Sequence, residues 1–149
     1  MEYVTDDTPF DRLYLRGLAI RYEGHRGLWM PIMWHLALRG YPGAMIELAD
    51  WFSDGASGEG MGTAADAFSA AGLYRRAYLK GDARAAKNFA VSHFNRGDLH
   101  GYRTWLRRAA IAGDTDAMAE LRYFELRLPH RHARKVGRLR PRQKRDDVL

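Results

Sequence analysis

Cysteine is absent from this chain of 149 residues. Disulfide bonds, thiolate metal sites and cysteine nucleophiles are therefore excluded, together with the enzyme classes that need them. Long apolar runs are missing too, because the longest extends only from Leu28 to Trp34 and contains Pro31. That run is too short to cross a bilayer, and the acidic N-terminus, MEYVTDDTPFDR, does not resemble a secretory signal. We expect a soluble cytoplasmic protein.

Strand signals are also scarce. β-Branched residues are few, apolar and polar residues do not alternate cleanly, and no Asn-Gly or Asp-Gly turn joins two strand-like runs. Aromatic residues make up 12% of the chain, which is too many for a disordered protein. The mass of 17.1 kDa is that of a single domain. We therefore predict a folded, all-α protein.

The positive charge is concentrated at one end of the chain. Up to Leu128 the 16 basic and 16 acidic residues cancel, whereas from Pro129 onward 8 basic residues face 2 acidic ones and account for the whole net charge of +6. The chain thus consists of a neutral body and a basic C-terminal arm. The basic residues of the arm are Arg131, Arg134, Lys135, Arg138, Arg140, Arg142, Lys144 and Arg145.

The body contains an internal repeat. Gly40, Gly81 and Gly113 open the similar stretches GYPGAMIELA, GDARAAKNFA and GDTDAMAELR. A small residue lies four positions after each glycine, and a large apolar residue lies eight positions after it, which is the spacing of one helix face. The small residues are Ala44, Ala85 and Ala117, and the large ones are Leu48, Phe89 and Leu121. Counting backward by eight and by four gives a second helix face, formed by Ile32, Leu73 and Trp105, then Leu36, Ala77 and Ala109.

Each repeat is therefore predicted to be a helix, a loop, a second helix and a glycine. The glycine suits the left-handed conformation that ends many helices. Asp82 and Asp114 follow two of these glycines and are expected to cap the next helix. We expect about seven helices in antiparallel hairpins, with Ala77, Ala109 and Ala110 where helices cross closely.

These residues resemble the Sel-one-like repeats, which are relatives of the tetratricopeptide repeat. The resemblance covers Phe10 to Leu126, with two well-matched units and a degenerate first unit. The matching residues are Asp66, Ala70, Leu73, Tyr74, Ala77, Tyr78 and Gly81, then Asp98, Tyr102, Trp105, Leu106, Ala109, Ala110 and Gly113, and in the degenerate unit His25, Trp29, Ile32, Leu36, Ala37 and Gly40.

The resemblance implies a short right-handed α/α solenoid of about three hairpins, in which the first helix of each repeat lines a concave, protein-binding face. It implies no catalytic residues. The expected organisation is an N-terminal segment at 1–9, a helical-repeat domain at 10–128 and the basic arm at 129–149.

Other motifs have simpler explanations. The string GASGEGMG, residues 55–62, is interpreted as a loop because no strand precedes it and Glu59 would repel a phosphate. Six histidines are scattered without a metal-binding motif, and His93 is interpreted as a hydrogen-bonded core residue. No base, nucleophile and orienting group can be combined from the serines and histidines. We therefore predict no enzyme activity, no metal and no cofactor.

The leading hypothesis is a protein-binding module that serves as an adaptor, a regulator or a toxin-neutralising immunity protein. Trp51 and Met45 lie off the apolar stripe of Leu48 and Phe52 and are predicted to face outward, although Trp51 packing on the neighbouring helix is an equal alternative. The predicted partner-binding residues are Met45, Asp50, Trp51, Lys87, Ser92 and Arg122. The alternative hypothesis is nucleic-acid binding through the basic arm, which is otherwise a solvated tail.

Overall fold

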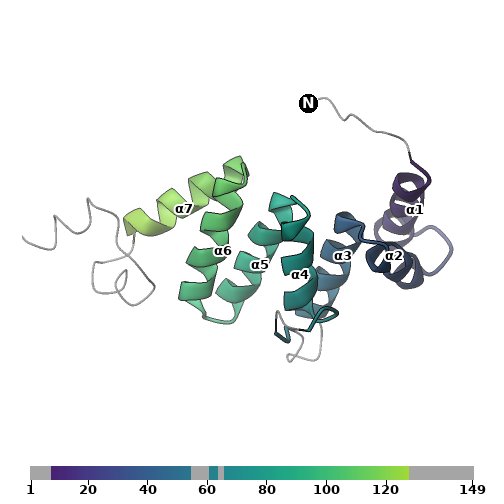
Figure 1. Cartoon of the computed structure of the whole chain (residues 1–149), viewed down its shortest axis with the longest axis horizontal. Coiled ribbons are helices and arrows are strands. Elements are labelled where there is room, and N and C mark those ends of the chain that lie inside the picture. Colours follow the sequence, from purple (N-terminus) through teal and green to yellow (C-terminus); the bar gives the residue numbers. More distant parts are fainter. Residues whose placement is uncertain (1–7, 55–60, 64–65, 128–149) are drawn as a thin grey trace, which may run out of the picture. The chain divides into compact units, whose positions relative to one another are not determined.

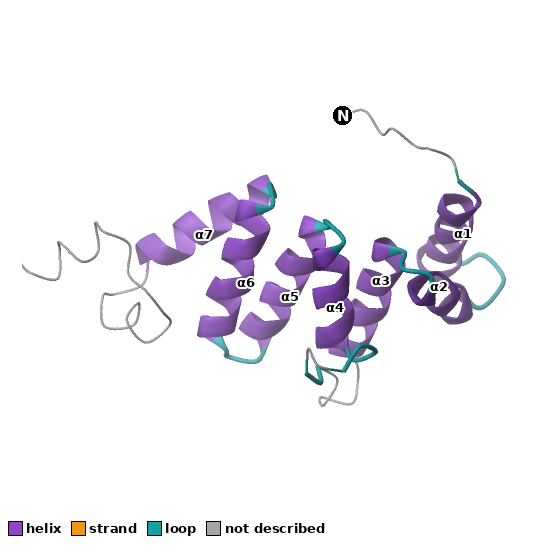
Figure 2. Ribbon diagram, in the orientation of Figure 1, coloured by secondary structure: helices purple, strands orange, loops and turns teal. Residues whose placement is uncertain are grey.

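The computed structural model describes residues 8–54, 61–63 and 66–127. These residues form seven α-helices and no strand, which confirms the predicted all-α class (Figures 1 and 2). Internal contacts divide the chain into two compact units, unit 1 from Met1 to Lys80 and unit 2 from Gly81 to Leu149. The division falls inside the segment 10–128 that the sequence predicts as one domain. The basic arm, 129–149, lies outside the described residues.

Unit 1 contains α1 (Pro9–Glu23), α2 (Trp29–Leu38), α3 (Pro42–Ser53) and α4 (Ala70–Leu79). Each of these helices packs against the next one along the chain. Large side chains that are almost completely buried fill the space between them, and these are Met33, Leu36, Met45, Leu48, Leu73 and Tyr74. Because α2 and α4 both pack on α3, this helix is enclosed on more than one side.

Unit 2 contains α5 (Ala83–Asn95), α6 (Leu99–Ile111) and α7 (Thr115–Arg127), with α6 packed against both of the other helices. Alanines without exposed surface let these helices approach one another closely, and they are Ala85, Ala86, Ala90, Ala109 and Ala117. Arg103 of α6 and Glu125 of α7 form a nearly buried ion pair with an Nε to Oε1 distance of 3.2 Å. The aromatic contact between Phe89 and Trp105 joins α5 to α6.

Local sequence signals account for the helix ends. Gly40, Gly81 and Gly113 have φ angles of 84°, 96° and 103°, which confirms the predicted left-handed glycines. The carboxylates of Asp82 and Asp114 accept backbone N–H bonds at the starts of α5 and α7, with lengths of 3.1 and 2.9 Å, so both predicted caps are confirmed.

The start of α4 differs from the start of α6, although the repeat pattern aligns the two. Asp98 caps α6 directly, whereas its counterpart Asp66 lies in a turn and Ser69 caps α4 instead. The turn brings the Asp66 carbonyl so close to Gly72 that a Cβ atom there would overlap it. Gly72 therefore allows the turn to fold back onto the first residues of α4.

Candidate functional site

The most elaborate group of polar and aromatic side chains in unit 1 joins the end of α1 to α2 and α3. We call it the aromatic–carboxylate cluster, and it consists of Arg21, Tyr22, Trp29, Glu47 and Trp51. It is half-open to solvent, because Tyr22 is 62% exposed and Trp51 is 47% exposed. Exposed aromatic residues that are held in place by their neighbours are typical of protein contact surfaces.

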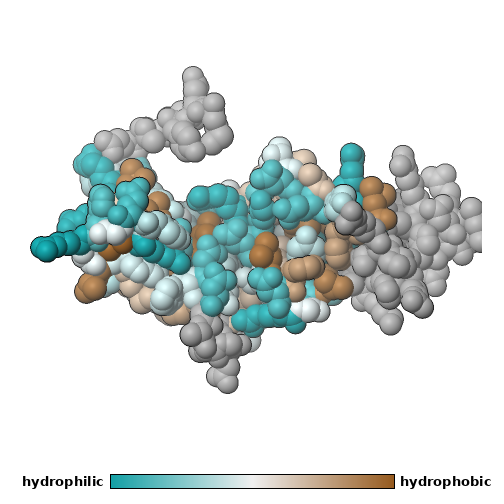
Figure 3. All heavy atoms as spheres, turned by 180° about the vertical axis from the view of Figure 1, so that it is seen from behind, coloured by the Kyte–Doolittle hydropathy of each residue, from teal (hydrophilic) through white to brown (hydrophobic). Residues whose placement is uncertain are grey.

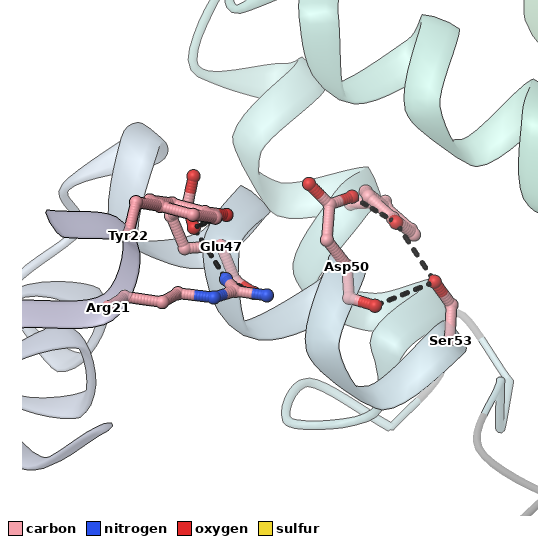
Figure 4. A network of polar contacts seen from close by, with 6 residues as sticks. Arg21, Tyr22, Glu47, Asp50 and Ser53 are labelled. Carbon is pink, nitrogen blue, oxygen red and sulfur yellow. Dashed lines mark hydrogen bonds and ion pairs between the residues drawn. The ribbon is translucent and has the colours of Figure 1, made fainter. Parts of the chain in front are cut away.

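Glu47 is the polar centre of this cluster (Figure 4). Its Oε2 atom accepts a hydrogen bond of 2.5 Å from Arg21 Nη1 and one of 2.8 Å from the Tyr22 hydroxyl. The same Arg21 nitrogen also donates to the Glu47 backbone carbonyl at 3.2 Å. Both charged side chains are mostly buried, with exposed fractions of 15% for Arg21 and 14% for Glu47. These bonds fix the end of α1 against the middle of α3.

The rings of the cluster surround the Arg21 guanidinium. Its Cζ atom lies 4.4 Å from the ring centroid of Trp29, 4.9 Å from that of Tyr22 and 5.8 Å from that of Trp51. Trp29 and Trp51 meet edge to face, with centroids 5.4 Å apart and planes at 74°. A guanidinium held over aromatic faces and paired with a carboxylate is a stable cation–π arrangement. Trp51 is therefore firmly oriented although about half of it remains accessible.

The surroundings of Tyr22 change the pKa of its hydroxyl. Burial raises the pKa of Tyr22 to about 12, and the hydrogen bond to Glu47 and its negative charge act in the same direction. The positive charge of Arg21 partly opposes these effects. The neutral phenol is thus the form that the cluster favours, because a phenolate would face the carboxylate of Glu47.

A second polar network lies one turn further along α3. The Tyr74 hydroxyl of α4 donates a bond of 2.5 Å to Asp50 Oδ1, and the Ser53 hydroxyl donates one of 3.2 Å to the Asp50 carbonyl (Figure 4). The hydroxyls of Ser53 and Tyr74 are also 3.2 Å apart. Asp50 is half-buried, and its carboxylate connects α3 to α4 through Tyr74.

The sequence left two alternatives for Trp51, an outward-facing side chain or one packed on the neighbouring helix. The structure shows both features, because the ring packs on Trp29 of α2 and is also 47% exposed. The prediction that Met45 faces outward is wrong, because this side chain has no exposed surface. Met45 lies off the Leu48 stripe, but α3 packs against α2 and α4 and therefore buries two faces. The prediction had assumed a helix with only one buried stripe.

The remaining predicted contact residues belong to unit 2. Lys87 of α5 forms a salt bridge of 3.4 Å with Asp116 of α7. Ser92 is buried, contrary to its predicted place on a contact face, because it is small and its hydroxyl bonds to the Asn88 carbonyl. Arg122 is exposed beside a groove along α7 that is lined by Thr115, Met118, Ala119, Arg122, Tyr123 and Leu126.

Four members of the cluster are not among the predicted partner-binding residues: Arg21, Tyr22, Trp29 and Glu47. Arg21 and Glu47 lie 26 positions apart and meet only through the packing of α1 and α2 onto α3. One available signal was the spacing of Glu47, Asp50 and Trp51, which places them on one side of a helix. The face in Figure 3 mixes apolar and hydrophilic side chains, so exposed apolar residues alone do not mark a site.

The histidines do not form a metal-binding group in the part of the chain that the structure describes. His93 Nδ1 lies 3.0 Å from Asp98 Oδ2, as expected for a hydrogen-bonded residue, but its Nε2 atom is buried without a partner. No group of three or more histidine, aspartate and glutamate residues is arranged to hold a metal ion within the described ranges. The string at 55–62 lies mostly outside those ranges, as does the whole arm.

The described chain is thus an all-α protein of packed helices whose most organised surface feature is an aromatic–carboxylate cluster. No protein-family model matches the chain, and searches of curated proteins and of solved structures found no match either. No helix within the described residues is long and apolar enough to cross a membrane.

Proposed function

We propose that this chain is a non-enzymatic helical-repeat protein that binds another protein, and that Trp51 is central to the contact surface. The proposal includes membership of the Sel-one-like repeats and their right-handed solenoid. Support comes from the glycines at repeat positions, the aspartate caps and the buried alanines between helices. Such a protein can act as an adaptor, a regulator or an immunity protein that neutralises a toxin.

The observation that carries the proposal is the half-exposed Trp51 on a rigid support. Its ring is held against Trp29, and the Arg21 to Glu47 ion pair fixes the surrounding residues. A large ring that is already oriented loses little conformational entropy on binding, which makes tryptophan a frequent anchor residue in protein interfaces. The residue before it in the chain, Asp50, is half-buried and accepts a hydrogen bond from the Tyr74 hydroxyl of α4.

The test is capture of partners from the native host with the full chain as bait, followed by affinity measurements on the purified partner. Trp51→Ala should weaken binding by about 2 kcal/mol or more if the ring is a buried anchor. Ile111→Ala is the matched control, because Ile111 is an exposed apolar residue on α6 of unit 2. Circular dichroism and thermal unfolding should show that both variants are folded.

A partner that binds Trp51→Ala with unchanged affinity would contradict the proposal. If Trp51→Ala unfolds, Tyr22→Ala tests the same surface, because Tyr22 is the most exposed ring of the cluster. Deletion of residues 129–149 distinguishes protein binding from the alternative function, which is nucleic-acid binding through the basic arm. A nucleic-acid binder would lose retention on DNA or RNA, whereas a protein-binding module would keep its partner with slower, less salt-sensitive association.

A further inference from the structure

We propose that the exposed face of α7 binds the exposed face of α1 in a second copy of this chain, so that copies associate head to tail. This inference goes beyond the proposed function, because it concerns a contact between identical chains that does not involve Trp51. Three observations lead to it: a groove along α7, an apolar face on α1, and opposite charges along the edges of the two.

The first observation is the groove along α7. Met118 lies five positions after its repeat glycine, as do Met45 of α3 and Ala86 of α5. Met45 and Ala86 have no exposed surface, and α3 and α5 both pack against the helix that follows them. Met118 is 47% exposed and lines a groove of about 420 Å³. In α7 the groove therefore lies at a repeat position that α3 and α5 bury completely.

The exposed side chains of this groove are large and apolar. Tyr123 and Leu126 line it together with Met118, and both are more exposed than Met118. In stacked helical repeats, the outer face of a terminal helix is normally polar, which keeps the protein soluble. A contiguous apolar face on such a helix instead favours contact with another molecule.

The second observation is an apolar face on α1. Gly17 is buried and lies close to side chains of α2, so the opposite side of α1 is turned away from that helix. Leu15 is 60% exposed on this opposite side, and Leu18 and Ala19 next to it are partly exposed. Their spacing of three and four positions places them on one face of the helix. Helix α1 thus offers a second apolar surface to a helix of another copy.

The third observation is the charge beside each face. Asp116 and Glu120 lie one turn apart along one edge of the α7 groove, and Arg12 and Arg16 lie one turn apart along one edge of the α1 face. All four residues are exposed. Asp116 already contacts Lys87, whereas Arg16 and Glu120 form no ion pair with another described residue. Arg16 and Glu120 therefore give the clearest match of opposite charges.

These charges favour α1 over a second α7 as the occupant of the groove. Two α7 helices related by a two-fold axis would run antiparallel with their acidic edges together, which brings Glu120 next to carboxylates of its copy. Two α1 helices would likewise bring Arg16 next to guanidinium groups. An antiparallel α7 and α1 place carboxylates beside guanidinium groups instead. The acidic residue near the end of α1, Glu23, lies about two turns beyond Arg16 and 3.6 Å from His25.

The first test is sedimentation of the full chain at increasing concentration. A head-to-tail contact does not close on itself, so the average mass should rise beyond that of a dimer. Leu15→Asn and Met118→Asn each damage one of the two faces, and each variant alone should associate about fivefold or more weakly. An equal mixture of the two should form one-to-one dimers of wild-type affinity, because each variant supplies one intact face. Circular dichroism should show that both variants are folded.

The second test exchanges the charges. Arg16→Glu and Glu120→Arg each place like charges together, and each should weaken self-association about threefold or more at low salt. The variant that carries both substitutions has opposite charges again and should associate as the wild type does. Arg107→Glu is the matched control, because Arg107 is an exposed arginine on α6, and it should have no effect. Recovery in the double variant would show direct contact, since structural damage would add up instead.

The inference is overturned if the full chain stays monomeric at every concentration, or if the double charge variant associates as weakly as the single ones. It is also overturned if Leu15→Asn associates as well as the wild type, which would assign α7 to a contact with another α7. A full chain that is monomeric, while the chain without residues 129–149 associates, would identify the basic arm as the occupant of the groove and would refute the second copy. The proposed function is tested separately, by Trp51→Ala and the captured partner.

Discussion

Replacing Glu47 with glutamine tests how the candidate site is held together. The side chain keeps its size and can still accept a hydrogen bond, but it loses its negative charge. Arg21 then remains among three aromatic rings without its counter-charge, and Tyr22 donates to a neutral oxygen instead of a carboxylate. Charge-assisted bonds are roughly twice as strong as neutral ones, so both contacts weaken.

The magnitude follows from how far the pair is buried. Exposed ion pairs contribute about 0–1 kcal/mol, whereas breaking a fully buried pair costs about 3–5 kcal/mol. Arg21 and Glu47 are 15% and 14% exposed, so the pair lies between these limits. We expect Glu47→Gln to lower the free energy of unfolding by about 2 kcal/mol, which corresponds to a fall in melting temperature of roughly 4–8 °C for a chain of this size.

The same substitution should change the titration of Tyr22. Burial is the largest cause of its raised pKa and persists in the variant, whereas the charge of Glu47 is removed. The pKa of Tyr22 should therefore fall below about 12 and stay above the ordinary value of 10. Because the folded state binds this proton more tightly than the unfolded state, its contribution to stability is complete below pH 10 and is lost as the pH rises toward 12.

Thermal unfolding measures the first effect, and phenolate absorbance, compared with that of Tyr22→Phe, measures the second. Asp116→Asn is the control, because the Lys87 to Asp116 pair involves a carboxylate that is 80% exposed. That variant should lose less than about 1 kcal/mol. The reasoning is refuted if Glu47→Gln melts at the wild-type temperature, or if Tyr22 titrates as it does in the wild type.

Two further predictions concern the helix packing of unit 2. Ala109 is completely buried, so Ala109→Leu should overpack the helix crossing and lower stability by about 1–3 kcal/mol; a wild-type melting curve would show that the position tolerates a larger side chain. At Gly101 an added Cβ would lie 2.5 Å from both His93 Nδ1 and Asp98 Oδ2. Gly101→Ala should therefore displace the capping aspartate and cost about 1–3 kcal/mol in denaturant unfolding, and an unchanged midpoint would count against this tight contact.

Features that depend on a few neighbouring residues were predictable. A glycine can adopt positive φ without a steric penalty, and an aspartate directly after it can bond to the N–H groups of the next helix, so Gly81 with Asp82 and Gly113 with Asp114 define helix ends by themselves. The spacing of small and large apolar residues likewise predicted which alanines are buried.

Features that depend on how many neighbours a helix has were not predictable. One apolar stripe correctly identifies Leu48 as buried, but it cannot show that α3 is packed by two helices, and Met45 was therefore assigned to the wrong side. Ser92 shows the same limit, because a small polar residue can be buried when its hydroxyl bonds to its own helix.

The residues of the candidate site likewise fall into two groups, those that the sequence indicates and those that only helix packing brings together. The sequence alone pointed to Trp51 and Asp50, because both lie beside the core stripe of one helix. Only the tertiary structure brings Arg21 and Tyr22 of α1 to Glu47 of α3, since 26 and 25 positions separate these residues, α2 lies between them in the chain, and no local pattern links them. Local geometry decides where helices begin and end, whereas the packing of several helices decides which side chains meet.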